Sequence, residues 1–153
     1  MFGDSLILKT CDVELLGLGI SMASRAISNF FNTNLRKYGV TMNQMYLMYA
    51  LAEYRGKNVG FIAKKMFMNY KSMMVCIRSM PKYVETHKNS ADKRSVYPAL
   101  TKEGSTFLKE MMPKMMELEQ GIGIFAKDKN DFINFVYNFS GEITKKARFE
   151  SEK

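Results

Sequence analysis

The sequence has little of the chemistry that most enzymes and metal sites need. It contains one histidine, two cysteines and no tryptophan among 153 residues. A single histidine excludes an HExxH motif and any zinc site built on several histidines. The phosphate-binding pattern GxxxxGKS/T and the nucleophile pattern GxSxG are both absent from the chain. We therefore expect a protein that is not an enzyme and that holds no metal or cofactor.

Long apolar runs and paired cysteines are scarce as well. The stretch Leu15–Ala23 is broken by two glycines and a serine, and it falls short of the ~20 residues of a membrane helix. Cys11 and Cys76 are too few for a disulfide scaffold. The first ten residues include Asp4 and do not resemble a signal peptide. These features favour a cytoplasmic protein without a membrane partner, with residues 1–153 forming a single subunit.

What the sequence does have is a concentrated positive charge. The formal net charge is +8, and the whole excess lies in residues 55–104, where eleven basic side chains face three acidic ones. The flanking segments 1–54 and 105–153 each balance to zero. A polyanion such as nucleic acid is the simplest partner for such a block. The alternative is a solvated basic surface that only keeps the protein soluble.

The pattern of apolar residues predicts a chain that is mainly α with a small β-hairpin. In chain order we expect a helix from Asp12 to about Lys37, a helix from Thr41, a short helix after Asn58, a helix from Asn69 to Pro81, strands near 83–88 and 94–100, a helix from Thr101 to about Gln120, and a last helix opening at Asp128 or Asp131.

Local signals support these boundaries. Thr41 and Gln44 have the spacing of a capping box, and Gly39 supplies a stop for the preceding helix. Met73 and Ile77 lie four residues apart and define one buried face of the fourth helix, with basic and small polar residues on its other face. Pro98 suggests a strand at the edge of a sheet.

Three short helices followed by a hairpin form a winged helix-turn-helix. A helix with basic and small polar groups on one face fits the DNA major groove, which is about 12 Å wide. A hairpin with a cationic tip reaches the adjoining minor groove. The basic block covers these elements and almost nothing else, which favours duplex DNA as the partner.

At this point the chain resembles the MarR-type transcriptional regulators. Val40–Leu51 is similar to the family's LTxxQxxxLxxL helix, and Ile62-Ala63 and Asn69–Met80 fall where its next two helices lie. Asp92-Lys93-Arg94 followed by Leu100–Gly104 resembles the family's wing signature, DxR and then LTxxG. Between recognition helix and wing the chain is shorter than the family's passage and lacks its glycine.

The resemblance implies an obligate homodimer that binds a palindromic operator, one winged helix per subunit. It implies a DNA-binding region over about 40–104 and dimerisation helices over 10–38 and 105–150. It also implies that the fourth helix reads the major groove and that Arg94, oriented by Asp92, reaches toward the minor groove. If the protein responds to a ligand, a small molecule would bind between the dimerisation helices and the winged helix, change the spacing of the two DNA-reading helices and weaken DNA binding.

Two groups of residues are therefore candidates for function. The predicted DNA contacts are Lys64, Asn69, Lys71, Ser72, Arg78, Lys88, Lys93 and Arg94. The predicted dimerisation stripe is Phe132, Phe135, Val136, Phe139 and Ile143.

Several alternatives stay open at this stage. The apolar stripe could belong to an intramolecular core, and the basic helix face could simply be solvated. Cys11 could sense oxidants, although an inert thiol is the simpler interpretation. Met73, Cys76 and Met80 could suit a soft metal, although such residues usually fill cores. The chain could also be a winged-helix interaction module or antirepressor that binds a protein and not DNA.

Overall fold

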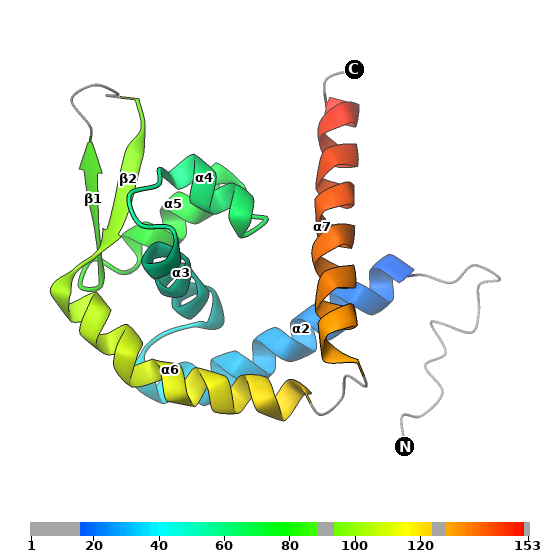
Figure 1. Ribbon diagram of the computed structural model, residues 1–153, viewed down its shortest axis with the longest axis horizontal. Helices are drawn as coiled ribbons and strands as arrows, with labels where there is room; N and C mark the ends of the chain where they lie inside the picture. The colour runs from blue at the N-terminus through cyan, green and yellow to red at the C-terminus, as the bar shows by residue number, and fades with distance from the viewer. Residues whose placement is uncertain (1–15, 89–93, 124–127, 152–153) are drawn as a thin grey trace. The chain divides into compact units, whose positions relative to one another are not determined.

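The computed structural model describes residues 16–88, 94–123 and 128–151. These residues are mainly helical and include one two-stranded antiparallel sheet (Figure 1). The elements are α2 (Leu16–Leu35), η1 (Arg36–Tyr38), α3 (Met42–Glu53), α4 (Val59–Lys65), α5 (Tyr70–Arg78), β1 (Val84–Lys88), β2 (Val96–Leu100), α6 (Lys102–Gly123) and α7 (Lys129–Ser151). Their order confirms the expected fold class. The chain forms two compact units, one ending at Met42 and the other beginning at Asn43.

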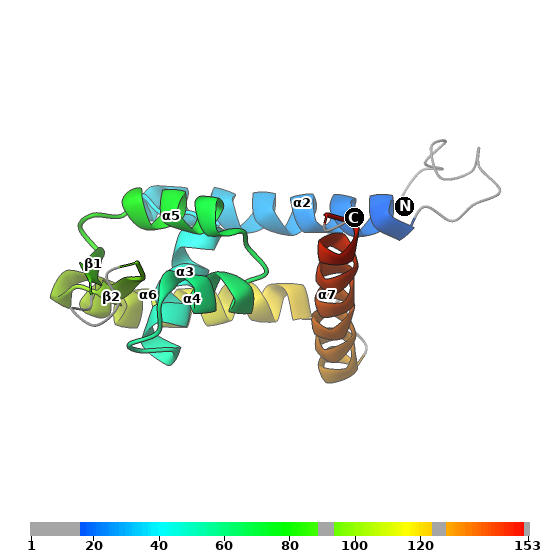
Figure 2. The same ribbon diagram turned by 90° about the horizontal axis from the view of Figure 1, so that it is seen from above.

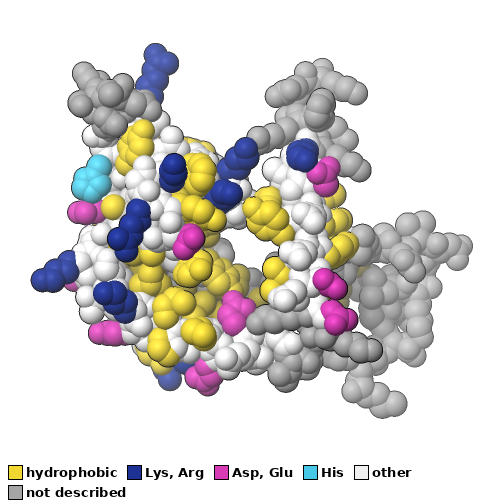
Figure 3. All heavy atoms as spheres, in the orientation of Figure 1, with side chains coloured by type: hydrophobic (Ala, Val, Ile, Leu, Met, Phe, Trp, Pro, Cys, Tyr) yellow, Lys and Arg dark blue, Asp and Glu magenta, His cyan; other side chains and the backbone are white. Residues whose placement is uncertain are grey.

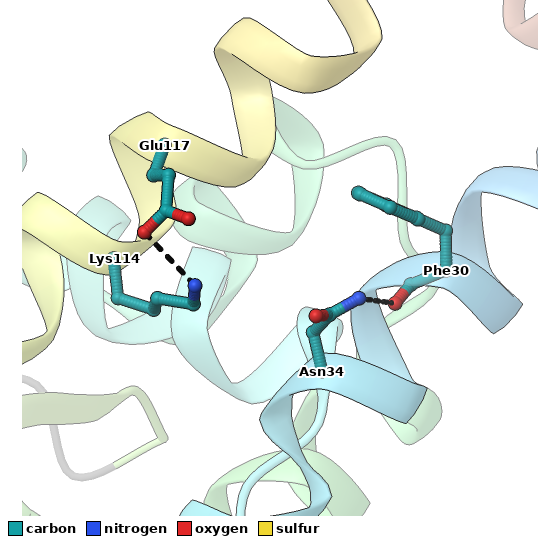
Figure 4. A network of polar contacts seen from close by, with 4 residues as sticks. All are labelled: Phe30, Asn34, Lys114 and Glu117. Atoms are coloured by element: carbon teal, nitrogen blue, oxygen red, sulfur yellow. Dashed lines mark hydrogen bonds and ion pairs between the residues drawn. The ribbon is translucent and has the colours of Figure 1, made fainter.

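The first unit holds α2 and the short 3-10 helix η1. Within α2, Asn34 Nδ2 donates a hydrogen bond to the carbonyl oxygen of Phe30 at 2.8 Å (Figure 4). The α-helix ends earlier than predicted, because its last turn tightens into η1. Gly39 then stops the helix with a φ of 71°, as predicted for a residue without a Cβ. The predicted cap Asp12 lies outside the described residues.

In the second unit, two asparagines cap the short helices as predicted. Asn58 Oδ1 accepts a hydrogen bond from the backbone N–H of Phe61 at 2.9 Å and starts α4. Asn69 Oδ1 accepts one from the N–H of Ser72 at 2.7 Å and starts α5. Each cap satisfies a backbone donor that the helix itself leaves without a partner.

The core of the second unit is built from aliphatic and methionine side chains. No polar or charged side chain in the described ranges is buried. The fully buried large side chains of this unit are Met45, Leu47, Met48, Val59, Ile62 and Met73. Met80, like Met73, is buried, which supports core packing over a metal site. Among the described residues, no three His, Cys, Asp or Glu side chains gather as they would around a metal ion.

The two strands form the predicted hairpin. Val84 pairs with Leu100 and Lys88 pairs with Val96 at the two ends of the ladder. Pro98 lies opposite Thr86, which is tolerated because each strand of a two-stranded sheet has an open edge. The hairpin packs against α4, α5 and the start of α6 (Figures 1 and 2).

The two long C-terminal helices differ slightly from expectation. Thr101 Oγ1 accepts a hydrogen bond from the N–H of Gly104 at 2.9 Å, which confirms Thr101 as the cap of α6. The predicted end at Gln120 is wrong, since α6 continues to Gly123 and its glycines stay helical. An ion pair on its surface joins Lys114 Nζ and Glu117 Oε2 at 2.9 Å (Figure 4).

The last helix, α7, follows Asp128 directly, the first of the two predicted starts. Across the three described segments, no helix is both long and apolar enough to span a membrane.

Candidate nucleic-acid interface

Helix α5 separates an apolar face from an exposed one. Met73 and Ile77 are buried in the core. The opposite face exposes Lys71, Ser72 and Arg78, all three of them predicted DNA contacts. Asn69, also a predicted contact, uses its side-chain oxygen to cap the helix. The helix therefore presents a basic and polar surface whose orientation the core fixes.

A side-chain hydrogen bond that the sequence did not predict holds the end of α5. Gln44 Nε2, on α3, donates to Ser79 Oγ at 2.9 Å. Ser79 Oγ in turn donates to the carbonyl oxygen of Cys76 at 2.7 Å. The two bonds tie the C-terminus of α5 to α3. Nothing in the local sequence indicates this pairing, because the two partners are 35 residues apart.

The wing brings Arg94 close to the start of α5. A shallow depression of about 170 Å³ is lined by Asn58, Val59 and Gly60 of the α4 start, Tyr70 of α5, and Arg94, Ser95 and Val96 of the wing. Arg94 and the first residue of α5 therefore border the same hollow. Lys88, at the end of β1, is exposed. Lys93 and Asp92 lie outside the described residues.

A close backbone contact anchors the wing to α6. Thr101 N–H donates to the carbonyl oxygen of Tyr83 at 3.0 Å, and Thr101 Oγ1 donates to that of Lys82 at 2.8 Å. A Cβ on Gly104 would lie only 2.1 Å from the Tyr83 oxygen. The Tyr83 ring also stacks on Phe107, with centroids 4.6 Å apart. The short helix-to-wing junction thus packs closely on Gly104.

Every basic side chain described in the 55–104 block is exposed. Lys64 and Lys65 lie in the last turn of α4, and Lys65 Nζ sits 5.6 Å from the centre of the Tyr54 ring. Figure 3 shows basic side chains outnumbering acidic ones over the wing and the helices beside it. The described basic residues of this block are therefore all accessible to a polyanion.

A cavity of about 310 Å³ lies between α3 and α6. Its walls are mostly apolar, and its lining residues are Met45, Tyr46, Tyr49, Leu108, Met112, Met115, Met116 and Glu119. The Tyr46 hydroxyl donates to Glu119 Oε1 at 2.5 Å. Burial, and then this carboxylate, raise the pKa of Tyr46 well above its usual value. Tyr46 therefore stays a hydrogen-bond donor, and Glu119 supplies the one carboxylate of the lining.

The thiol of Cys76 is half-buried on α5, and burial raises its pKa. A raised pKa leaves less of the reactive thiolate at neutral pH. The raised pKa therefore disfavours Cys76 as an oxidant sensor. Cys11 lies outside the described residues.

The predicted dimerisation stripe on α7 is open to solvent in the single chain. Phe132, Phe135, Val136 and Ile143 are all exposed, and Phe139 is partly so. Phe135 and Phe139 stack with centroids 5.9 Å apart. These side chains are therefore not part of the intramolecular core that the alternative interpretation required.

Comparison of the sequence with family models and with curated proteins found no match. Comparison of the fold found many. The S. aureus MepR–DNA complex superposes with a TM-score of 0.70 at 16% identity, covering 85% of this chain and 97% of that one. AbsC, a MarR family transcriptional regulator from Streptomyces coelicolor, superposes with a TM-score of 0.71 at 17% identity, covering 90% of this chain and 96% of that one. The S. coelicolor transcriptional regulator PcaV, solved with its natural ligand, superposes with a TM-score of 0.72 at 13% identity, covering 83% of this chain and 92% of that one. This chain has the fold of the MarR-type winged-helix regulators.

Proposed function

We propose that this chain is a sequence-specific regulator of transcription that binds double-stranded DNA as a homodimer and represses from a palindromic operator. The observation that carries the proposal is the exposed face of α5 with Lys71, Ser72 and Arg78. The wing residue Arg94 borders the same hollow as Tyr70, the first residue of that helix. A helix of this kind fits the major groove, and the wing then reaches the neighbouring groove. S. aureus MepR, which has the same fold, was solved in complex with DNA, which supports DNA as the partner.

The exposed apolar side chains of α7 support the homodimer. This exposed stripe of phenylalanine, valine and isoleucine side chains would face water in a single chain. A second copy covers such a stripe by the same residues, in a two-fold contact. Two-fold pairing presents two copies of α5 to the DNA, which matches a palindrome with half-sites one helical turn apart, about 34 Å.

A titration of duplex DNA at several salt concentrations tests the function. Contacts to phosphates release counterions, so log K should fall linearly with log salt concentration. Lys71→Ala and Arg94→Ala should each weaken binding and lower the magnitude of the salt slope by about one, if each meets one phosphate. Both variants should remain dimers.

Lys109→Ala is the matched control, because Lys109 is an exposed lysine on α6 outside the basic block. It should leave the affinity and slope as in the original protein. No measurable binding to any duplex at low salt would refute the DNA-binding proposal and favour a protein-interaction module. A Lys71 or Arg94 variant that dissociates into monomers would show that the residue was wrongly assigned to DNA.

We infer that a small-molecule effector binds in the cavity between α3 and α6 and lowers the DNA affinity. The apolar walls suit an aromatic body, and the Glu119 carboxylate suits a positive charge. PcaV, of the same fold, was solved with a ligand. The effector would shift the population toward a spacing of the two α5 helices that the operator does not fit.

Benzyltrimethylammonium and its neutral isostere neopentylbenzene form a matched pair of probes. The cation should raise the melting temperature and weaken DNA binding more than the isostere does. Glu119→Gln should remove the difference between them. Equal effects of the two compounds on the original protein would refute the assignment of Glu119 as the charge-recognising group.

A further inference from the structure

Val75 occupies the centre of the exposed face of α5. The residue is 61% exposed, the largest exposed fraction among the large hydrophobic residues that the structure describes. It lies four residues after Lys71, three after Ser72 and three before Arg78, so these side chains share one helix face. The core does not explain an apolar side chain here, because Met73 and Ile77 supply the buried face.

We propose that Val75 reads thymine through the methyl group at C5 of the base. The inference rests on the proposed DNA-binding function and names what its central helix residue recognises. A valine side chain has neither a hydrogen-bond donor nor an acceptor. Among the base-edge groups in the major groove, the thymine methyl is the apolar one. Contact between the two removes apolar surface from water on both sides.

The same side chain discriminates against other bases. Adenine, guanine and cytosine present amino, carbonyl or ring-nitrogen groups to the major groove. Val75 would strip water from such a group and offer no hydrogen bond in return, which is unfavourable. A β-branched side chain in a helix also has one strongly preferred χ1 rotamer, so its methyl groups are held in place.

Ser79, one helical turn after Val75, does not compete with Val75 for the base. Ser79 lies four residues on, and its hydroxyl accepts from Gln44 Nε2 and donates to the Cys76 carbonyl oxygen. Those bonds also hold the end of α5 on α3. Val75 therefore sits on a fixed helix between two basic side chains, Lys71 and Arg78, that can meet the phosphates on either side.

The test compares thymine with uracil, which lacks only the methyl. Duplexes that the full-length protein enriches from a random pool are resynthesised with every thymidine replaced by deoxyuridine. We expect binding about fourfold weaker for one contacted methyl, and about fifteenfold weaker when both half-sites lose it. Val75→Ala should show a much smaller difference between the two duplexes, because the two γ methyl groups that reach furthest from the helix are gone.

Two further variants separate this contact from general effects. Lys71→Ala should weaken binding to both duplexes and keep the thymine-to-uracil ratio of the original protein. Val75→Thr keeps a methyl group in the same shape and should keep part of the preference. Far-UV circular dichroism checks that each variant is folded, which is expected because Val75 is exposed.

Each outcome bears on a stated claim. Equal affinity of the original protein for thymine and uracil duplexes overturns the inference and leaves DNA binding intact. A Val75→Ala variant that keeps the full preference overturns it as well, because another residue then reads the methyl. If no duplex is enriched or bound, the proposed DNA-binding function fails and this inference fails with it.

Discussion

Substitution of Gly104 by alanine tests how the wing is held. Gly104 lies in the first turn of α6, and an added Cβ would come within 2.1 Å of the Tyr83 carbonyl oxygen and 2.9 Å of its carbonyl carbon. Both neighbours are backbone atoms, so no side-chain rotation relieves the clash. The junction between α5 and β1 must move away from α6.

The cost follows from the contacts that this movement breaks. The junction is held by the two hydrogen bonds of Thr101 to Tyr83 and Lys82, worth about 1 kcal/mol each. The stacked pair of Tyr83 and Phe107 adds about 1 kcal/mol. Alanine returns at most about 1 kcal/mol through its higher helix propensity. We expect Gly104→Ala to lower the free energy of unfolding by about 2 kcal/mol.

Urea unfolding followed by far-UV circular dichroism, at one protein concentration, measures this change. The urea midpoint should fall by about 1 M. Gly60→Ala is the control, because a Cβ there would meet only Asn58 Oδ1 at 3.5 Å, an ordinary contact. It should be neutral or slightly stabilising. A Gly104→Ala midpoint equal to or above that of the original protein would refute the close approach and the anchoring role derived from it.

Two further predictions concern Tyr46 and Phe67. Burial and the Glu119 carboxylate raise the pKa of Tyr46, so the stability that Tyr46 contributes is present below about pH 10 and is lost as the pH rises toward the raised pKa. In urea unfolding at pH 9, 10 and 11, the Tyr46→Phe variant should therefore lose less stability with rising pH than the original protein. Equal losses in the two proteins would contradict this. Phe67 has a φ of 51°, a strained left-handed conformation, and its ring meets that of Tyr137 at 5.4 Å. Phe67→Gly and Phe67→Ala both remove the ring, but only glycine relieves the strain, so the glycine variant should be more stable by about 1 kcal/mol, and an alanine variant of equal or greater stability would count against the strain.

Local signals in the sequence predicted most of the elements. Three helices start at a predicted cap, because the side-chain oxygen of the cap accepts a hydrogen bond from the backbone N–H three residues later. The caps are Asn58, Asn69 and Thr101. Gly39 stops a helix for an equally local reason. The predicted end of α6 at Gln120 was wrong because a glycine inside a helix costs only about 1 kcal/mol, which tertiary packing can override.

The candidate site was predictable only in part. The exposed face of α5 followed from helical periodicity, since Met73 and Ile77 had to be buried. The anchor at Gly104 and the hydrogen bond between Gln44 and Ser79 depend on the distance between segments far apart in sequence. Sequence periodicity carries no such distances. The position of Arg94 beside Tyr70 likewise required the packed hairpin.

Selectivity for one DNA sequence over others depends, under the proposal, on both α5 and α7. In the proposed complex, Lys71 and Arg78 meet phosphates, which leaves Ser72 and Val75 of one α5 to read bases, and a good base contact discriminates by about 1–3 kcal/mol. Specific sites are preferred over other DNA by about 4–10 kcal/mol in typical regulators. A helix with so few polar groups falls at or below the lower end of that range when it acts alone, whereas two copies on a palindrome reach well into it. The proposed function therefore makes the exposed stripe on α7 as important for sequence selectivity as the face of α5, because the stripe would pair the two helices.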